Sequence, residues 1–396
     1  MLENKNIVVG VTGGIASYKT LAIVSKLKKA GANVNVIMTE AATEFVKPLT
    51  FRSLSQNPVT VEMFSEPSNW DVEHISLADK ADLFLIAPAT ANIIGKIANG
   101  IADDMLSTTV MATEAEVIIA PAMNVKMYQN SIVQKNISIL KEHGYSIIEP
   151  DKGYLACGYE GQGRFPAPEE IAQYSKAHLM VEGSLEGKKV LVTAGGTKEA
   201  LDPVRYLGNN SSGKMGYALA RVAEAKGAEV TLISAPTNLS SPKGINKVAI
   251  ETAQEMKEEV FKYKDKQDVI IMAAAVADYR PKNKSTLKLK KSADNLSLEL
   301  EATNDILAQL GAEKKSELLV GFAAESNNML SYAQKKLKQK NLDLIVANNI
   351  AKSDIGFAAN KNQVTIIKAE EQIEVTKADK LKIAVDIFAE IEKLIT

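Results

Sequence analysis

The sequence NIVVGVTGG at residues 6–14 decides the fold of the first part of the chain. It is an apolar run that ends in a glycine pair, and apolar residues then recur at helical spacing over residues 17–30. A second apolar run at residues 33–38 closes a strand–helix–strand unit. Short apolar runs at 82–88 and 116–121 are typical of a parallel sheet covered on both faces. The pattern predicts a doubly wound α/β domain.

The same pattern begins again with GKKVLVTAGGT at residues 187–197. A chain of 396 residues is also longer than one hydrophobic core usually supports. We therefore predict two Rossmann-like or flavodoxin-like domains, 1–186 and 187–396, each with a mainly parallel sheet flanked by helices. A polar linker is expected at residues 176–186. The further strands expected in the second domain lie at residues 227–234, 269–275, 318–322 and 342–347.

The bulk composition is that of an ordinary globular protein, with 46% hydrophobic and 24% charged residues. The formal net charge of -1 provides no general basic field, so we expect small-molecule ligands and no nucleic acid. The first residues lack the layout of a signal peptide, and the composition argues against a membrane span. A cytoplasmic protein without a membrane partner is expected. The single cysteine, Cys157, excludes an intramolecular disulfide.

Small or uncharged polar residues follow the predicted strands of the first domain, at the carboxyl ends where open α/β sheets bind ligands. Four such loops imply one crevice, with room for a flat ring system and hydroxyls for a phosphate. This lining suits flavin mononucleotide (FMN), although each loop taken singly also fits an ordinary turn. The loop residues expected to bind the cofactor are Gly13, Gly14, Ser17, Thr39, Ala89, Thr90, Asn92 and Ala122.

The sequence has three histidines, and only His74 has neighbours that suggest chemistry. His74 precedes a predicted helix, and it fits either a functional residue or a satisfied capping or core histidine. His143 is expected near the C-terminal end of a helix, where the helix dipole favours it. His178 is expected in the linker, without chemical neighbours.

Cys157 lies in the segment GYLACGYEGQGR at residues 153–164. Because so many glycines disfavour the interior of a helix or strand, the segment is expected to be a mobile flap. A buried structural cysteine normally lies within an apolar periodic run, which is not the case here. A thiol on such a lid could donate a proton once closure has expelled water.

The motifs GGIAS at residues 13–17, HISL at 74–77, PAMN at 121–124 followed by Met127, and ACG at 156–158 together resemble the homo-oligomeric flavin-containing cysteine decarboxylases. The resemblance implies FMN bound between the subunits of a trimer, often assembled into a dodecamer, with Met127 at the cofactor. It also implies that the cysteine moiety is oxidised, loses CO2 and is reduced again. In that reaction His74 would assist oxidation and decarboxylation, Asn124 would hold the substrate carboxylate, and Cys157 would protonate the ene-thiol.

A polar loop, DPVRYLGNNSSGKMG at residues 202–216, opens an amphipathic helix in the second domain. Its serine hydroxyls, N–H groups and lysine could cradle a phosphate, although a serine-capped helix start fits as well and the spacing is not that of a P-loop. Asp278 is expected at a strand end, where it could meet a ribose or a metal-bound phosphate.

Lysines recur in two further patterns of the second domain. Residues 287–291 alternate like one strand of a hairpin that returns at residues 296–300. Lys336 and Lys340 share one face of a predicted helix. Lysines on strands and helices are usually solvated, so both patterns also fit an ordinary surface.

These motifs resemble the phosphopantothenate–cysteine ligase module that follows the decarboxylase in many bacterial fused enzymes. Together, the two resemblances cover essentially the whole chain. It implies that 4'-phosphopantothenate attacks the α-phosphate of CTP, releasing pyrophosphate, and that L-cysteine then displaces CMP. It implies Mg2+ with Asp278 as its ligand, Asn209 in the second half-reaction, and Lys288 at the nucleotide and on the activated acyl intermediate. The other residues implied at the nucleotide are Ala274, Ala275, Asp278, Asn304, Asp305, Ile306, Leu307, Phe322, Lys336 and Lys340.

One residue departs from the family pattern. In GFAANKN at residues 356–362, Asn360 stands where the family usually has an aspartate, so no role is predicted for this loop. The resemblance also implies dimeric C-terminal domains beside the trimer-based N-terminal assembly.

Two other functions fit parts of the sequence. A non-catalytic flavoprotein of the same fold would be favoured by loss of His74 or Cys157, and both residues are present. A dehydrogenase with a nicotinamide cofactor is disfavoured because neither glycine turn has the GxGxxG spacing.

Overall fold

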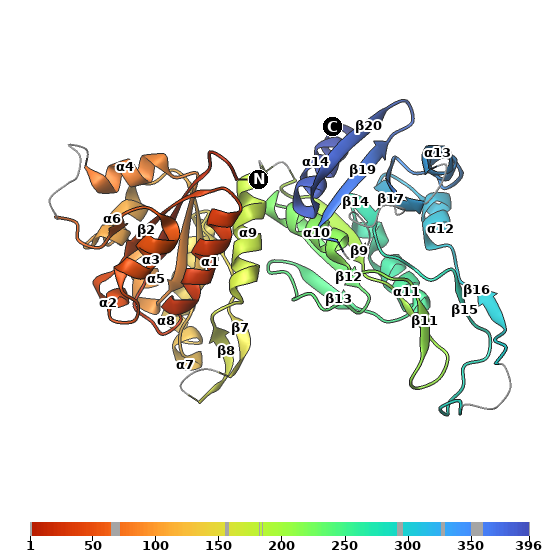
Figure 1. Ribbon diagram of the computed structural model, residues 1–396, viewed down its shortest axis with the longest axis horizontal. Coiled ribbons are helices and arrows are strands. Elements are labelled where there is room, and N and C mark those ends of the chain that lie inside the picture. The colour runs from red at the N-terminus through yellow and green to blue at the C-terminus, as the bar shows by residue number, and fades with distance from the viewer. Residues whose placement is uncertain are drawn as a thin grey trace. The chain divides into compact units, whose positions relative to one another are not determined.

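The computed structural model describes residues 2–64, 72–154, 158–181, 183, 185–290, 296–325, 329–349 and 359–395. The chain divides into two compact units, Met1–Met180 and Val181–Thr396, and each is described by itself (Figure 1). Among the described helices, none combines the length and the apolar character needed to cross a membrane.

The first unit is built on a six-stranded sheet in the order β3-β2-β1-β4-β5-β6. Neighbouring strands are parallel; Val9, for example, pairs with Val36 on one side and with Leu85 on the other. This is the strand order of a doubly wound domain, so the predicted fold is confirmed for this unit. The strands are β1 Asn6–Val11, β2 Asn33–Met38, β3 Val59–Thr60, β4 Leu83–Ala89, β5 Glu116–Pro121 and β6 Ser146–Ile147.

Helices cover both faces of this sheet because successive residues of a strand point to opposite sides (Figure 1). Val9 and Leu85 pack into one apolar cluster with α1, α3 and α9, whereas Val8 and Phe84 pack into another with α5, α6 and α8. The helices are α1 Ser17–Lys29, α2 Glu40–Thr43, α3 Pro48–Ser55, α4 Glu73–Lys80, α5 Ala91–Ala98, α6 Met105–Ala112, α7 Val125–Tyr128, α8 Ser131–Glu142 and α9 Pro168–Met180.

The second unit has an eight-stranded sheet in the order β13-β12-β9-β14-β17-β18-β19-β20. The strands from β13 to β18 are parallel, and β19 and β20 continue the sheet in antiparallel pairing. The predicted mainly parallel sheet is therefore confirmed here as well. The strands are β9 Lys189–Ala194, β12 Glu229–Ser234, β13 Asn246–Ala249, β14 Val269–Met272, β17 Leu318–Glu325, β18 Leu344–Asn349, β19 Lys361–Ile367 and β20 Gln372–Asp379.

The helices of the second unit form two groups. Met256 of α11, Leu310 of α12 and Leu337 of α13 share one apolar cluster with the strands, whereas α10 and α14 pack against each other and against the sheet. Two small hairpins stand beside the main sheet. The helices are α10 Lys214–Ala225, α11 Ala253–Tyr263, α12 Ile306–Glu313, α13 Met329–Gln339 and α14 Lys380–Ile395, with a 3-10 turn at Lys264–Lys266; the hairpins pair β10 Lys198–Ala200 with β11 Tyr206–Gly208 and β15 Tyr279–Pro281 with β16 Leu300–Ala302.

The hairpin predicted for residues 287–291 and 296–300 is wrong in position. The structure pairs β15 with β16 instead, and residues 287–290 have no strand. The reason is local: the backbone N–H of Leu289 donates to Asp202 Oδ2 at 3.1 Å, and its carbonyl accepts from Arg205 Nη2 at 2.7 Å. These bonds take the backbone groups that a partner strand would need.

The expectation that His178 lies in a linker without chemical neighbours is also wrong. His178 lies within α9, which continues to Met180. Its ring is stacked on Tyr174, and its Nδ1 lies 2.6 Å from Oε1 of Glu116. His143 follows the prediction, because it is the C-cap residue of α8.

Candidate active sites

The first unit has a hollow of about 860 Å³ at the carboxyl ends of β1, β2 and β4. Parallel strands end together at one edge of the sheet, so the loops that follow them converge there. Five of the residues predicted to bind a cofactor line this hollow: Gly13, Thr39, Thr90, Asn92 and Met127. Four other predicted residues are not part of the lining: Gly14, Ser17, Ala89 and Ala122.

Thr12 joins two of the converging loops. Its Oγ1 donates to the carbonyl of Pro88 at 2.7 Å and accepts from the backbone N–H of Thr90 at 3.1 Å. Thr90 in turn caps α5, because its Oγ1 accepts from the N–H of Ile93. Ser17, by contrast, is buried and donates to the carbonyls of Thr12 and Gly14, so its hydroxyl is used inside the loop.

The hollow fits a ligand that is flat and polar at its edges. Within the described part of the chain, the buried Oγ1 of Thr39 has no hydrogen-bond partner, which is unusual for a buried hydroxyl. Thr39 lines the hollow, so a bound molecule could supply the missing partner. Met38 and Met63 add apolar lining suited to a ring face.

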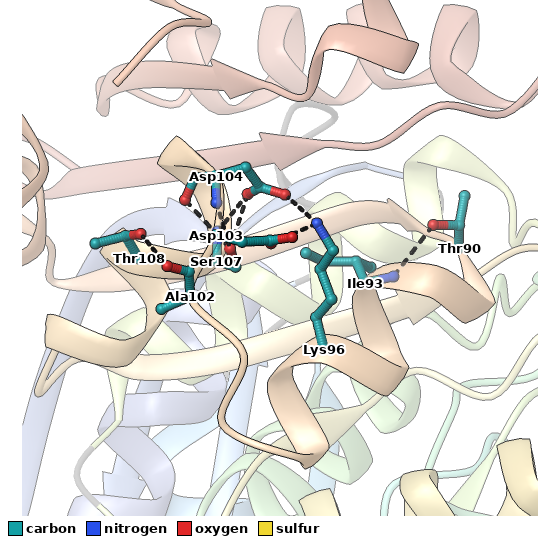
Figure 2. A network of polar contacts seen from close by, with 8 residues as sticks. All are labelled: Thr90, Ile93, Lys96, Ala102, Asp103, Asp104, Ser107 and Thr108. Atoms are coloured by element: carbon teal, nitrogen blue, oxygen red, sulfur yellow. Dashed lines mark hydrogen bonds and ion pairs between the residues drawn. The ribbon is translucent and has the colours of Figure 1, made fainter. Parts of the chain in front are cut away.

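A charged network lies on one wall of this hollow (Figure 2). Lys96 Nζ lies 2.6 Å from Asp103 Oδ1 and 2.7 Å from Asp104 Oδ2. Burial alone would lower the pKa of Lys96, but its hydrogen bonds to the two carboxylates outweigh this effect and raise the pKa. Asp104 also caps α6, since its Oδ1 accepts from the N–H of Ser107 at 2.8 Å. The network therefore fixes the α5–α6 connection against the hollow.

These three charged residues are not among those expected from the sequence. A signal was present, because Lys96, Asp103 and Asp104 are the only charged residues in the mainly apolar stretch 91–112. Charged residues on an apolar segment are often held as a pair.

Two of the residues predicted for decarboxylation, His74 and Asn124, are not part of the hollow's lining. His74 is half-buried in the first turn of α4, rather than before the helix as predicted. Asn124 is the N-cap of α7, and its Oδ1 accepts from the N–H of Lys126 at 2.8 Å. The predicted proton donor Cys157 lies outside the described residues.

The glycine-rich segment around Cys157 forms strands, contrary to prediction. Strands β7 Asp151–Tyr154 and β8 Glu160–Arg164 pair as a hairpin. Gly161 and Gly163 have φ values of 153° and 144°, which other residues rarely adopt. A Cβ at Gly163 would lie 2.4 Å from the carbonyl oxygen of Met123, whose N–H donates to the Gly163 carbonyl. The glycines therefore let the hairpin lie directly against the loop that carries Asn124.

The second unit has a separate cavity of about 710 Å³. Its lining comes from the loop before α10, the segment after β14, the start of α12 and the end of β17. Ten of the residues predicted for ligation line it: Asn209, Ala274, Ala275, Asp278, Asn304, Asp305, Ile306, Leu307, Phe322 and Lys340. The sequence motifs thus converge on one cavity although they are far apart along the chain.

Two side chains of this cavity form an ion pair. Lys340 Nζ lies 2.8 Å from Asp305 Oδ2, and Asp305 also caps α12 by accepting from the N–H of Ala308. Burial would raise the pKa of Asp305, but the hydrogen bond from Lys340 outweighs it and the pKa is lowered. Lys336 does not line the cavity, although the backbone N–H of Lys340 donates to its carbonyl at 3.0 Å and its charge also helps to lower the pKa of Asp305.

Asn209 lies in the loop before α10, and Asp278 directly precedes β15. Asn209 Nδ2 donates to the carbonyl of Val276 at 2.9 Å, and Asp278 is exposed within the cavity. Among the described residues, no group of three or more His, Cys, Asp or Glu side chains is arranged to hold a metal ion. A metal at Asp278 would therefore take most of its ligand atoms from water and a bound phosphate.

Lys288 is exposed and does not line the cavity. The residue after it is held by Asp202, whose Oδ2 also accepts from Arg205 Nε at 3.0 Å and Nη2 at 2.6 Å. This Arg205–Asp202 pair clamps the backbone on which Lys288 lies.

Lys380 and Asn348 are cavity residues that were not expected from the sequence. Lys380 is the first residue of α14. A cation at a helix N-terminus, where the dipole disfavours it, was the available signal. Asn348 has a buried Oδ1 that finds no hydrogen-bond partner within the described ranges, so this cavity too offers an unsatisfied atom to a ligand.

Each of the two units matches a known family model. Residues 1–180 match the flavoprotein family model, and residues 185–395 match the DNA/pantothenate metabolism flavoprotein C-terminal domain. The coenzyme A biosynthesis bifunctional protein CoaBC of Bacillus subtilis is 51% identical over 398 residues, covering 100% of this chain and 98% of that protein. The CoaBC protein of Haemophilus influenzae is 42% identical, covering 98% of each.

Among solved structures, the C-terminal domain of a coenzyme A biosynthesis bifunctional protein CoaBC is 44% identical, with a TM-score of 0.47, and covers 54% of this chain and 98% of that one. The sequence relationship to whole relatives and both domain matches confirm the resemblance drawn from the motifs. The chain belongs to the family of bifunctional coenzyme A biosynthesis proteins.

Proposed function

We propose that the second unit joins L-cysteine to 4'-phosphopantothenate with CTP, and that the first unit decarboxylates the product to 4'-phosphopantetheine with FMN. The observation that carries the proposal is that a chain related along its whole length to bifunctional proteins has a cavity at a sheet edge in each of its two units. We assign the decarboxylase to residues 1–186 and the ligase to residues 187–396.

The ligation needs groups that stabilise phosphate charge and hold an acyl intermediate. The carboxylate of 4'-phosphopantothenate attacks the α-phosphate of CTP and pyrophosphate leaves; the amine of cysteine then displaces CMP. Lys340 supports this role because it lines the cavity and is oriented by Asp305. Asn209 would act in the amine step, and Lys288 would act on the acyl intermediate from its clamped segment.

Mg2+ is the metal that we propose for this site. It is commonly held by one or two carboxylates together with substrate phosphates, and it would neutralise charge on the nucleotide. Asp278 is exposed in the cavity and provides one such carboxylate.

For the decarboxylation, bound FMN would accept two electrons from the cysteine moiety and later return them. Gly13, Thr39 and Thr90 would hold it, as the unpartnered hydroxyl of Thr39 supports. Asn124 would bind the substrate carboxylate that leaves as CO2, His74 would assist that step, and Cys157 would protonate the resulting ene-thiol. The hairpin seated on the Asn124 loop supports a shared site for Asn124 and Cys157, since Cys157 belongs to the same hairpin sequence.

We further propose a cytoplasmic homo-oligomer, with trimers of the first unit assembled into a dodecamer and dimers of the second. Large apolar side chains on the first unit support an interface, because Ile15, Tyr18 and Leu49 are 60%, 55% and 68% exposed.

The test is to incubate the protein with 4'-phosphopantothenate, cysteine, CTP and Mg2+ and to follow CMP, pyrophosphate, CO2 and 4'-phosphopantetheine. A flavin absorbance spectrum should accompany the purified protein. Lys288→Gln should abolish most pyrophosphate release yet still decarboxylate supplied phosphopantothenoylcysteine. A nicotinamide spectrum, or neither product from wild type, would contradict the proposal.

A further inference from the structure

Lys380 is a buried cation that the ligation described above does not use. It is 6% exposed, yet it lines the cavity of the second unit. Burial of an ammonium group costs free energy unless other groups compensate the charge. A buried titratable residue on a cavity wall is therefore a candidate for ligand binding.

A second lysine lies close to it. Lys214, the first residue of α10, also lines the cavity, and its Nζ donates to Asn360 Oδ1 at 2.7 Å. The backbone carbonyl of Asn360 accepts from the backbone N–H of Lys380 at 3.2 Å. Asn360 thus connects both lysines, one through its side chain and the other through its main chain. Burial first, and then repulsion from Lys214, lower the pKa of Lys380 to about 8.

Both lysines also begin helices. The positive end of a helix dipole disfavours a cation, and α10 and α14 have 12 and 16 residues. The N-cap of α10 is Gly213, which makes no side-chain cap hydrogen bond to the first turn. Ammonium groups, backbone N–H groups and helix dipoles of one sign are typical of an anion site.

Two carboxylates in the described part of this region have other partners. Asp305 pairs with Lys340, and Asp379 Oδ1 accepts from the N–H of Leu381 in the first turn of α14. Asp379 raises the pKa of Lys380, but burial and Lys214 outweigh it. A bound anion would stabilise the two ammonium groups further.

We propose that Lys380 and Lys214, linked by Asn360, form a phosphate subsite of this cavity together with the start of α10. The proposal deepens the proposed function and rests on it for the source of the phosphate. Two ligands offer one: the polyphosphate of the nucleotide and the phosphomonoester of 4'-phosphopantothenate.

Calorimetric titration of the full chain with CTP and, separately, with 4'-phosphopantothenate tests the proposal. We expect Lys380→Met to weaken one of the two by about 10- to 100-fold, the range for a lost hydrogen bond to a charged group. Lys380→Arg keeps the charge and should lose far less. A loss of affinity for CTP assigns the subsite to the polyphosphate. A loss of affinity for 4'-phosphopantothenate assigns it to the phosphomonoester.

The matched control is Lys382→Met, which removes an exposed lysine two residues further along α14 that pairs with Asp386. It should leave both affinities unchanged. Unchanged affinities in Lys380→Met would overturn the subsite. If that variant does not fold, Lys214→Met decides, because it removes the other ammonium group of the subsite and should weaken binding of the same ligand, and an unaffected affinity would refute the proposal. If wild type binds neither ligand, the proposed function fails instead.

Discussion

The two cavities lie at equivalent edges of doubly wound sheets, yet their linings differ in charge. Among the residues that the structure describes, the charged ones that line the first are Glu40, Glu62, Lys96, Asp103 and Asp104. Those of the second are Lys214, Asp278, Asp305, Lys340 and Lys380. Four acidic residues with one lysine thus contrast with three lysines and two acidic residues. The fold sets where a ligand lies, and the loops set which charged groups surround it.

The largest effect is expected for Lys340→Met. This change removes a cavity cation and leaves Asp305 without its partner, so pyrophosphate release should fall about 100-fold or more. Decarboxylation of supplied phosphopantothenoylcysteine should be unaffected, because Lys340 belongs to the other unit. An equal loss of both activities would show that the cavities are not independent.

Asp202→Asn should have the next largest effect, and it should act only by changing the position of Lys288. The Arg205 guanidinium lowers the pKa of the Asp202 carboxyl, which also holds the backbone of Leu289. Loosening this clamp should reduce pyrophosphate release at least tenfold by misplacing Lys288. Combined with Lys288→Gln, it should add little further loss, and a fully additive double variant would contradict the positioning role.

Lys96→Met tests the acidic cavity. It would leave Asp103 and Asp104 without the cation between them, so affinity for an anionic flavin should fall about tenfold. Absorbance titration of the flavin-free protein measures this. Pyrophosphate release should stay at the wild-type rate. A lower rate of pyrophosphate release together with unchanged flavin binding would show that Lys96 serves the ligation and not the flavin cavity.

The smallest effect is a pH dependence that only the basic cavity should show. The pKa of Lys380 is lowered to about 8 by burial and by Lys214, and the protonated form is the one that binds phosphate. Affinity should therefore fall several-fold as pH rises through 8, at most about tenfold between pH 7 and 9. Lys380→Arg should abolish this change. The pKa of Lys96 is raised, so flavin affinity should stay constant over the same range.

The features foreseen from the sequence are those that depend on strand periodicity. Apolar runs predicted both sheets, and because strand ends converge, Gly13 and Thr39 line one cavity while Asp278 and Phe322 line the other. Their contacts with ligands stay predictions. The charges of Lys96, Asp103 and Asp104 stand out in the sequence, but their pairing depends on where a neighbouring helix begins and therefore needed the structure.

Other differences arise where local preference yields to tertiary contacts. Helical phase groups Lys336 with Lys340, but only Lys340 lines the cavity, where it pairs with Asp305. Glycine content argues against strands at residues 153–164, yet β7 and β8 form because close packing against Met123 and Val125 requires glycine.

The hairpin of β7 and β8 packs against residues 123–125 through the backbone of its glycines. At Gly161 a Cβ would lie 2.9 Å from Val125 Cγ1, and at Gly163 it would meet the main chain of residue 123. Side chains cannot be added at these two glycines unless the hairpin and the loop that carries Asn124 move apart. A substitution at either glycine would therefore shift the Asn124 loop without touching any polar side chain.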